Sequence, residues 1–109
     1  MKPRVGVDLV ELKRFKKAVD RGQDRFLKRV FCPKELSDQR IEHLAGLFAA
    51  KEAIVKALSL PAGSWQKICV SRQKNGRPKV AIEGIKTPSF DLSISHDGNF
   101  AIAVFLCLE

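Results

Sequence analysis

The chain has 109 residues, of which 45% are hydrophobic and 29% are charged, and its formal net charge is +8. This length fits a single domain spanning residues 1–109, and the apolar content is ordinary for a globular protein, which argues against wholesale disorder. No apolar stretch approaches a membrane-spanning length, and the N-terminus reaches a charge too early for a signal peptide, so we expect a cytoplasmic protein without a membrane partner.

The positive charge is concentrated at the front of the chain. Residues 1–40 contain 12 Lys and Arg against 6 Asp and Glu, whereas the remaining residues contain 8 against 6. A basic front half favours an acidic partner. Nucleic acid, an acidic protein and a phosphorylated ligand all qualify, and charge alone does not choose among them.

The first half of the chain is predicted to be one strand followed by helices. Residues 5–10 are mostly apolar and predict a strand, interrupted at Asp8. Apolar residues at helical spacing predict basic helices over about 11–21 and 26–31, and Pro33 suits the first turn of a short helix over 33–36. A long helix over about 39–58 has an apolar stripe, formed by Leu44, Leu47, Phe48, Val55 and Leu58.

The second half of the chain changes to strand periodicity. Strands are predicted around Ile68 and Val70, over 78–82 after the Asn75-Gly76 hairpin signal, and over 92–96. Residues 100–108 are almost wholly apolar, so we expect a last strand that is buried on both faces. The order predicts an α+β domain in which an antiparallel sheet packs against the long helix.

The three cysteines are scattered along the chain. Cys32, Cys69 and Cys107 have no metal-ligand spacing. An odd, dispersed set favours reduced thiols that fill the core over a disulfide framework.

Asp8 is the first candidate for chemistry. With Glu11 it has the spacing of a helix capping box, which is the favoured interpretation on local grounds. The alternative is that its carboxylate binds a ligand.

The long helix carries a second group of candidates. Glu52 and Lys56 are four residues apart and share a face, where a solvated ion pair is the default interpretation. The alternative is that Glu52 and Lys56 face a bulky ligand, because the neighbouring side chains are small and would leave room for it. These small neighbours are Ala45, Ala49 and Ala53. Lys51 projects onto the apolar stripe. One interpretation is that its aliphatic stem lies along the apolar surface while the ammonium reaches water. The alternative is that its ammonium binds a phosphate in a groove between subunits.

His96 lies at the end of a predicted strand, beside the turn Asp97-Gly98-Asn99. A lone histidine in such a place is usually structural. A serine hydrolase is disfavoured, because no glycine elbow surrounds Ser93 or Ser95.

Five segments give a more specific signal through their order along the chain. They are Gly6-Val7-Asp8, Phe48-Ala-Ala-Lys-Glu-Ala-Ile-Val-Lys-Ala57, Trp65-Gln-Lys-Ile-Cys-Val70, Asn75-Gly-Arg-Pro78 and Ser93-Ile-Ser-His96. Together they resemble the holo-acyl-carrier-protein synthase family of phosphopantetheinyl transferases over nearly the whole chain. Members of that family are small α+β proteins that assemble as homotrimers with active sites in the clefts between subunits.

The resemblance implies a function and a set of site residues. The reaction is magnesium-dependent transfer of 4′-phosphopantetheine from coenzyme A to a serine of an apo-acyl carrier protein, with release of 3′,5′-ADP. Asp8 and Glu52 match the magnesium ligands, and Lys56 matches a lysine beside the reacting phosphate. Glu52, directly or through a metal-bound water, is the candidate general base.

The resemblance also implies binding surfaces for the two substrates. His96 matches a histidine that binds the coenzyme A nucleotide, and a turn near the adenine is matched by Asn75, Gly76, Arg77 and Pro78. The basic helices resemble a docking surface for the acidic carrier protein, with Arg14, Arg21, Arg25 and Phe26 as candidates.

Two departures from the family pattern affect coenzyme binding. The family has a phosphate-binding arginine where this chain has Leu47, and a Gly-Thr-Gly-like turn where it has Ser59-Leu-Pro-Ala-Gly63. We expect another cation, Lys51 or Arg77, to replace that arginine.

Two alternatives to an active transferase remain. A nucleic-acid-binding domain is supported by the basic front half, but no helix-turn-helix, zinc or RNA-binding signature accompanies it, so we expect no nucleic acid partner. An inactive, partner-binding member of the same fold is supported by Leu47.

Overall fold

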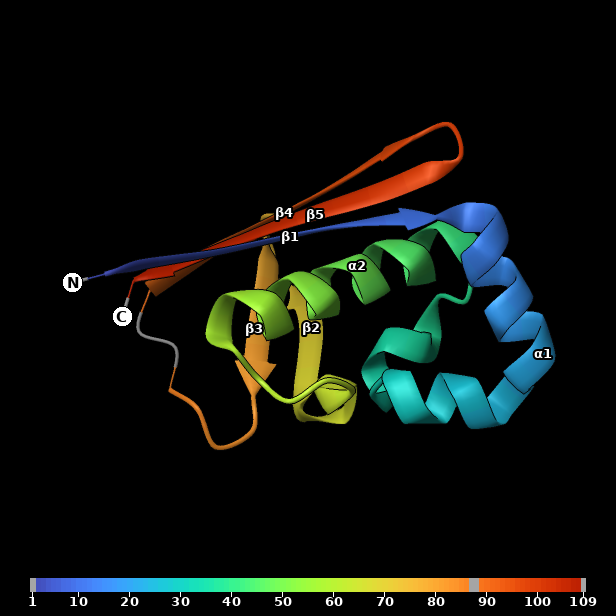
Figure 1. The fold of residues 1–109 in the computed structure, drawn as a ribbon, viewed down its shortest axis with the longest axis horizontal. Coiled ribbons are helices and arrows are strands. Elements are labelled where there is room, and N and C mark those ends of the chain that lie inside the picture. Colours follow the sequence, from blue (N-terminus) through green and yellow to red (C-terminus); the bar gives the residue numbers. More distant parts are fainter. Residues whose placement is uncertain (1, 87–88, 109) are drawn as a thin grey trace.

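The computed structural model describes residues 2–86 and 89–108, which form a sheet with helices on one side of it (Figure 1). The strands, in order across this antiparallel sheet, are β1 (Pro3–Glu11), β5 (Phe100–Leu108) and β4 (Ser89–Asp97). The long helix α2 (Ile41–Leu58) crosses one face and contacts all three strands. The predicted α+β class is confirmed. No helix within the described ranges is long and apolar enough to span a membrane.

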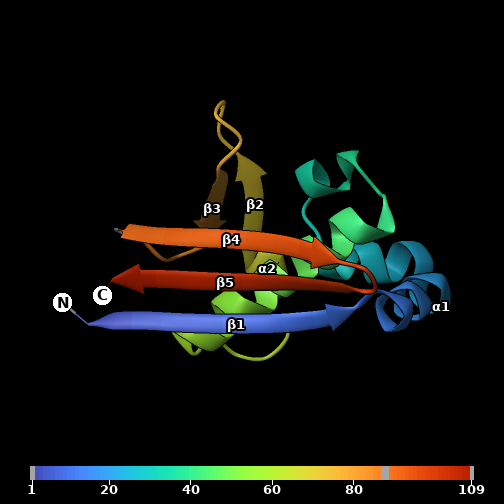
Figure 2. The ribbon, with the colours of Figure 1, turned by 90° about the horizontal axis from the view of Figure 1, so that it is seen from above.

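The remaining elements flank α2. Helix α1 (Leu12–Val30) joins the two predicted basic helices, which meet at a break where Gln23 leaves helical geometry with φ of 50°. Short 3₁₀ helices follow α1 and α2, namely η1 (Pro33–Ser37) and η2 (Ser64–Lys67). The hairpin of β2 (Ile68–Arg72) and β3 (Pro78–Ile82) lies on the β4 side of the sheet, whereas α1 lies at the end where β1 finishes (Figure 2).

Strand β1 and helix α2 approach each other very closely. A Cβ atom added at Gly6 would lie 1.9 Å from the carbonyl oxygen of Ala53, so only glycine fits there. The alanines expected to leave room for a ligand are fully buried, and they are Ala45, Ala49 and Ala53. That expectation was wrong, because their small side chains serve close packing.

The outer faces of β1 and β5 are apolar and uncovered. Along β5 the residues alternate, with Ala101 and Ala103 fully buried while Ile102 and Val104 remain about two-fifths exposed. On β1, Val5 is 66% exposed. The prediction that β5 is buried on both faces is therefore wrong for one chain, because the helices cover one side only (Figure 1). Exposed apolar patches of this kind mark interaction surfaces.

A buried ion pair lies on the opposite side of α2 from the sheet. The side chains of Lys51 and Glu35 are both 0% exposed, with Nζ 2.6 Å from Oε1. Glu35 also accepts hydrogen bonds from the backbone N–H groups of Cys32 and Val70, at 2.8 and 2.7 Å. Lys51 donates to the Val30 carbonyl at 2.7 Å. The pair thereby links α1, η1 and β2 to the long helix.

A disulfide between Cys32 and Cys69 reinforces this junction, with their Cα atoms 5.9 Å apart. The expectation of three reduced thiols is wrong for these two cysteines. They are 37 residues apart, and only the fold brings the start of η1 beside β2. Cys107 is buried in β5, as expected of a core residue.

Removing one partner of the buried ion pair should strongly destabilise the fold. We expect Glu35→Gln to lower the free energy of unfolding by about 3–5 kcal/mol, because it leaves the Lys51 charge buried without a counterion. Urea unfolding followed by the fluorescence of the single tryptophan measures this.

The matched control is Asp20→Asn, which breaks the exposed Lys16–Asp20 pair. Exposed pairs contribute little, so this loss should stay below about 1 kcal/mol. An equal decrease in the free energy of unfolding in the two variants would contradict the prediction that a buried charge without its counterion is especially destabilising.

Candidate active site

Asp8 faces α2 from the inner side of β1. It shares that side with Gly6 and Val10, since alternate residues of a strand point to the same face. Helix α1 begins only at Leu12 and has no side-chain cap, so the capping-box interpretation of Asp8 is wrong. The Asp8 side chain is 18% exposed, and its Oδ1 lies 3.1 Å from Lys56 Nζ.

Lys56 joins the helix to the strand. Its Nζ donates to the Val7 carbonyl at 3.0 Å as well as to Asp8. The side chain is still 56% exposed, so the ammonium is held in place yet accessible to a ligand. The default interpretation of a Glu52–Lys56 surface pair is thus replaced by a pair that crosses from α2 to β1.

Glu52 lies one helical turn before Lys56 and is partly buried. Burial raises the pKa of Glu52, and the nearby Asp8 carboxylate raises it further, while the Trp65 indole and the Lys56 ammonium oppose these effects. Two carboxylates from different elements therefore lie close enough to repel each other. Such a pair is suited to bind a cation.

The two carboxylates open into a cavity of about 360 Å³ between β1, α1 and α2. Its lining includes Phe48 of α2 together with Arg14, Phe15 and Phe26 of α1. Two of the four predicted docking residues thus line the same cavity as the carboxylates. Arg21 and Arg25 are exposed elsewhere on α1.

The turn at residues 75–78 lies on the other side of the molecule, between β2 and β3. Asn75 Oδ1 accepts a hydrogen bond from the Arg77 N–H at 3.0 Å, and the Arg77 guanidinium pairs with Asp91 of β4. The turn and β4 together line a polar cavity of about 430 Å³ that includes Asn75, Arg77 and Pro78.

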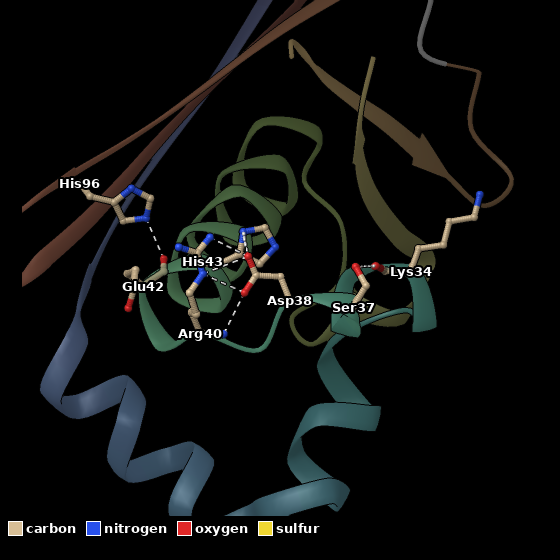
Figure 3. Close-up of polar contacts among 7 residues, drawn as sticks. All are labelled: Lys34, Ser37, Asp38, Arg40, Glu42, His43 and His96. Carbon is tan, nitrogen blue, oxygen red and sulfur yellow. Dashed lines mark hydrogen bonds and ion pairs between the residues drawn. The ribbon is translucent and has the colours of Figure 1, made fainter. Parts of the chain in front are cut away.

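A neighbouring cavity of about 240 Å³ contains Leu47. Its lining also includes Lys34, His43, Arg72 and Pro78. Sequence reasoning did not identify Lys34, His43 or Arg72 as site residues, since they come from three elements and share no spacing motif. Asp38, which also lines this cavity, lies beside Arg40 and His43 (Figure 3). Its Oδ2 is 2.7 Å from the Arg40 guanidinium.

His96 packs against the N-terminal part of α2. One ring nitrogen lies 2.7 Å from the Glu42 carbonyl (Figure 3), and a Cβ atom at Gly46 would lie 2.9 Å from the ring. These contacts support a structural role for His96 in holding β4 against α2. Because His96 is nevertheless exposed, it also remains accessible to a ligand.

The predicted residues form two groups that one chain keeps apart. Asp8 is on β1 and His96 is on β4, with β5 between them. Glu42, which His96 contacts, precedes Glu52 by ten residues of α2, or about 15 Å at the rise of a helix. The structure therefore gathers Asp8, Glu52 and Lys56 in one place and the turn, Leu47 and His96 in another.

Comparisons with known proteins identify the family. Residues 4–105 match the family model described as the 4′-phosphopantetheinyl transferase superfamily. The chain is 38% identical to the holo-[acyl-carrier-protein] synthase of Sulfurovum sp. (strain NBC37-1) over 93% of this chain and 92% of the relative. The chain belongs to the 4′-phosphopantetheinyl transferase superfamily.

Other members of the superfamily agree in sequence and in structure. The holo-[acyl-carrier-protein] synthase of Dehalococcoides mccartyi (strain ATCC BAA-2266 / KCTC 15142 / 195) is 39% identical over 95% of this chain and 97% of the relative. The crystal structure of the Helicobacter pylori synthase in complex with coenzyme A superposes with a TM-score of 0.84 at 36% identity, covering 93% of this chain and 96% of that one. The Neisseria meningitidis synthase has a TM-score of 0.84 at 26% identity, covering 97% and 98%.

Lys51 does not belong to the site of this superfamily member. Its ammonium is fully buried and is bonded to Glu35 and two backbone carbonyls. The prediction that Lys51 binds a coenzyme phosphate, or replaces the arginine missing at Leu47, is wrong for that reason. The roles assigned to the other site residues remain predictions.

The raised pKa of Glu52 should appear in the pH dependence of stability. A carboxyl whose pKa is raised by folding contributes stability at low pH that is lost as the pH rises through its folded-state pKa. We therefore expect Glu52→Gln to raise the free energy of unfolding of the metal-free protein at pH 8, by less than about 1 kcal/mol because solvent screens a partly exposed group.

The difference between Glu52→Gln and the unchanged chain should vanish below about pH 4, where an ordinary glutamate becomes protonated. Urea unfolding in excess chelator, repeated across this pH range, measures it. A variant that is less stable than the unchanged chain at pH 8 would show that ionised Glu52 is not strained in the free protein.

Proposed function

We propose that this chain transfers the 4′-phosphopantetheine arm of coenzyme A to a serine of an apo-acyl carrier protein. The observation that carries the proposal is the cluster of Asp8, Glu52 and Lys56, whose two carboxylates line a cavity shared with the basic helix α1. The holo-[acyl-carrier-protein] synthases it resembles over more than nine-tenths of its length support the same activity. The Helicobacter pylori neighbour bound to coenzyme A supports the choice of donor.

The two carboxylates fit a magnesium ion. Mg²⁺ is commonly held by one or two carboxylates together with phosphate oxygens and waters, and Asp8 and Glu52 offer two such ligands from separate elements. Their mutual repulsion, which contributes to the raised pKa of Glu52, would be relieved by a cation. Bound there, Mg²⁺ would neutralise charge on the coenzyme pyrophosphate.

Glu52 and Lys56 have complementary tasks in this proposal. A carboxylate whose pKa is raised is a better base, so Glu52 is suited to accept the proton of the attacking serine hydroxyl. Lys56, which is fixed by Val7 and Asp8 but exposed, would stabilise the negative charge that develops on the transferred phosphate.

The cavity at Leu47 is our candidate for the coenzyme nucleotide. Leucine provides no charge, but Lys34, Arg72 and His43 line the same cavity. Pro78, which belongs to the predicted adenine turn, lines it as well. We propose that Lys34 and Arg72 supply the positive charge missing at Leu47. Arg77 is less available for this task because it pairs with Asp91.

A complete site requires two copies of the chain. Asp8 and His96 lie on opposite edge strands of one sheet, and the apolar outer faces of β1 and β5 are uncovered. We propose a homotrimer in which each site combines the carboxylates of one copy with the nucleotide residues of the next. Cyclic contacts of this kind use two different surfaces of each copy.

The carrier protein is proposed to dock on α1. Arg14 and Phe26 line the cavity of the carboxylates, and Arg21 and Arg25 are exposed on the same helix. An acidic carrier attracted to these residues would deliver its serine close to Glu52.

The activity and its metal dependence have a direct test. We expect the chain to convert apo-acyl carrier protein to the holo form with coenzyme A and Mg²⁺, as followed by the mass increase of the carrier. Asp8→Ala and Glu52→Ala should each abolish transfer while leaving the circular dichroism spectrum unchanged. Full activity in excess chelator would contradict the metal, and no transfer at all would favour a partner-binding member of the fold.

The shared site predicts that two inactive variants complement each other. One variant carries Asp8→Ala, and the other carries His96→Ala with Arg77→Ala. Co-expressed, they should recover about a quarter of normal activity, because about one interface in four of a random trimer joins two intact halves. Activity no higher than the sum of the separate variants would show that each site lies within one chain.

A further inference from the structure

Trp65 is held firmly beside the carboxylates, yet it has no role in the site described so far. It lies in η2, where its backbone carbonyl accepts a hydrogen bond from the buried Lys51 ammonium at 3.2 Å. Its ring packs against Phe48, with centroids 5.7 Å apart at an angle of 45°. The backbone and the ring are thus both fixed.

The indole N–H of Trp65 is an unusual feature of this position. Nε1 is buried, and among residues 2–86 and 89–108 it has no hydrogen-bond partner. A buried donor left unpaired carries a desolvation penalty, and buried polar groups without partners are rare in folded proteins. An acceptor that forms only in another state of the site would account for it.

Glu52 is the acceptor within reach. It follows Phe48 by four residues of α2, so it lies on the helix face against which the indole packs. The indole N–H acts on the Glu52 carboxyl as a hydrogen-bond donor that lowers its pKa, so the two groups lie close together, although no hydrogen bond of normal geometry joins them. The Lys51 contact fixes the distance of η2 from the same helix.

We propose that Trp65 is a positioning residue, whose indole N–H donates to one oxygen of Glu52 when that carboxylate binds Mg²⁺ with the other. The inference rests on the proposed function, because it needs Glu52 to bind the metal. Carboxylates that bind metals are commonly oriented by hydrogen bonds from a surrounding group, and removing that group typically weakens metal binding 10- to 100-fold.

The single tryptophan of the chain allows a spectroscopic test. In a ¹⁵N-labelled sample of the full chain, the one indole N–H resonance should move downfield as Mg²⁺ alone is added, and the movement should saturate. In Glu52→Ala the resonance should not respond. A resonance that stays in place while calorimetry detects Mg²⁺ binding to the unchanged chain would overturn the proposal.

Matched variants separate the N–H from the ring. Trp65→Phe keeps an aromatic ring against Phe48, and replacement of Trp65 by β-(3-benzothienyl)alanine keeps the bicyclic shape, but neither has the N–H. Each should weaken Mg²⁺ binding by about 10- to 100-fold in calorimetry, with the thermal unfolding midpoint of the benzothienyl protein nearly unchanged.

The outcomes distinguish this inference from the proposed function. Equal Mg²⁺ affinity in the unchanged chain and the benzothienyl protein would overturn the role of Trp65 and leave the transferase proposal intact. A chain that binds no Mg²⁺ would overturn both. If Trp65→Phe fails to fold, the benzothienyl protein and the resonance of the unchanged chain still decide the question.

Discussion

The close approach of β1 to α2 is the constraint on which the candidate site depends. With no side chain at Gly6, the strand passes so near the helix that an added Cβ would lie 1.9 Å from the Ala53 carbonyl oxygen. Asp8 is two residues further along the same face of the strand, and Glu52 and Lys56 flank Ala53 on the helix. A larger residue at position 6 would force the two elements apart and separate Asp8 from its neighbours.

A second constraint acts on the opposite side of the same helix. Lys51 and Glu52 are adjacent in sequence but project in different directions, as a helical turn of 100° per residue requires. Lys51 holds Glu35, the Val30 carbonyl and the Trp65 carbonyl, and so fixes α1, η1 and η2 around the helix. Glu52 lines the cavity to which α1 also contributes a wall. The contact of Lys51 with the Val30 carbonyl thus helps to fix α1, which forms one wall of the site.

Much of this arrangement could be predicted from the sequence, because local patterns determine it. Alternation and helical spacing place the strands and α2 nearly where the structure has them, and the order of motifs brings Asp8, Glu52 and Lys56 into one hypothesis. The errors concern distant partners. The position of Lys51 on the apolar stripe is visible in the sequence, but its partner Glu35 lies 16 residues earlier in another element. The Cys32–Cys69 pairing is invisible for the same reason.

The exposed outer face of β5, which the sequence predicts to be buried, connects the site to the proposed assembly. Helix α2 covers the inner face of the sheet, where Ala101 and Ala103 of β5 lie opposite Val10 and Asp8 of β1, and the buried Phe105 lies opposite Gly6. The alternate residues of β5 face outward, and they include the large apolar side chains of Ile102 and Val104. The packing that brings the carboxylates together thus leaves an apolar surface that one chain cannot cover. In the proposed trimer, covering that surface would bring in the nucleotide residues of the next copy, so assembly and completion of the site would be a single event.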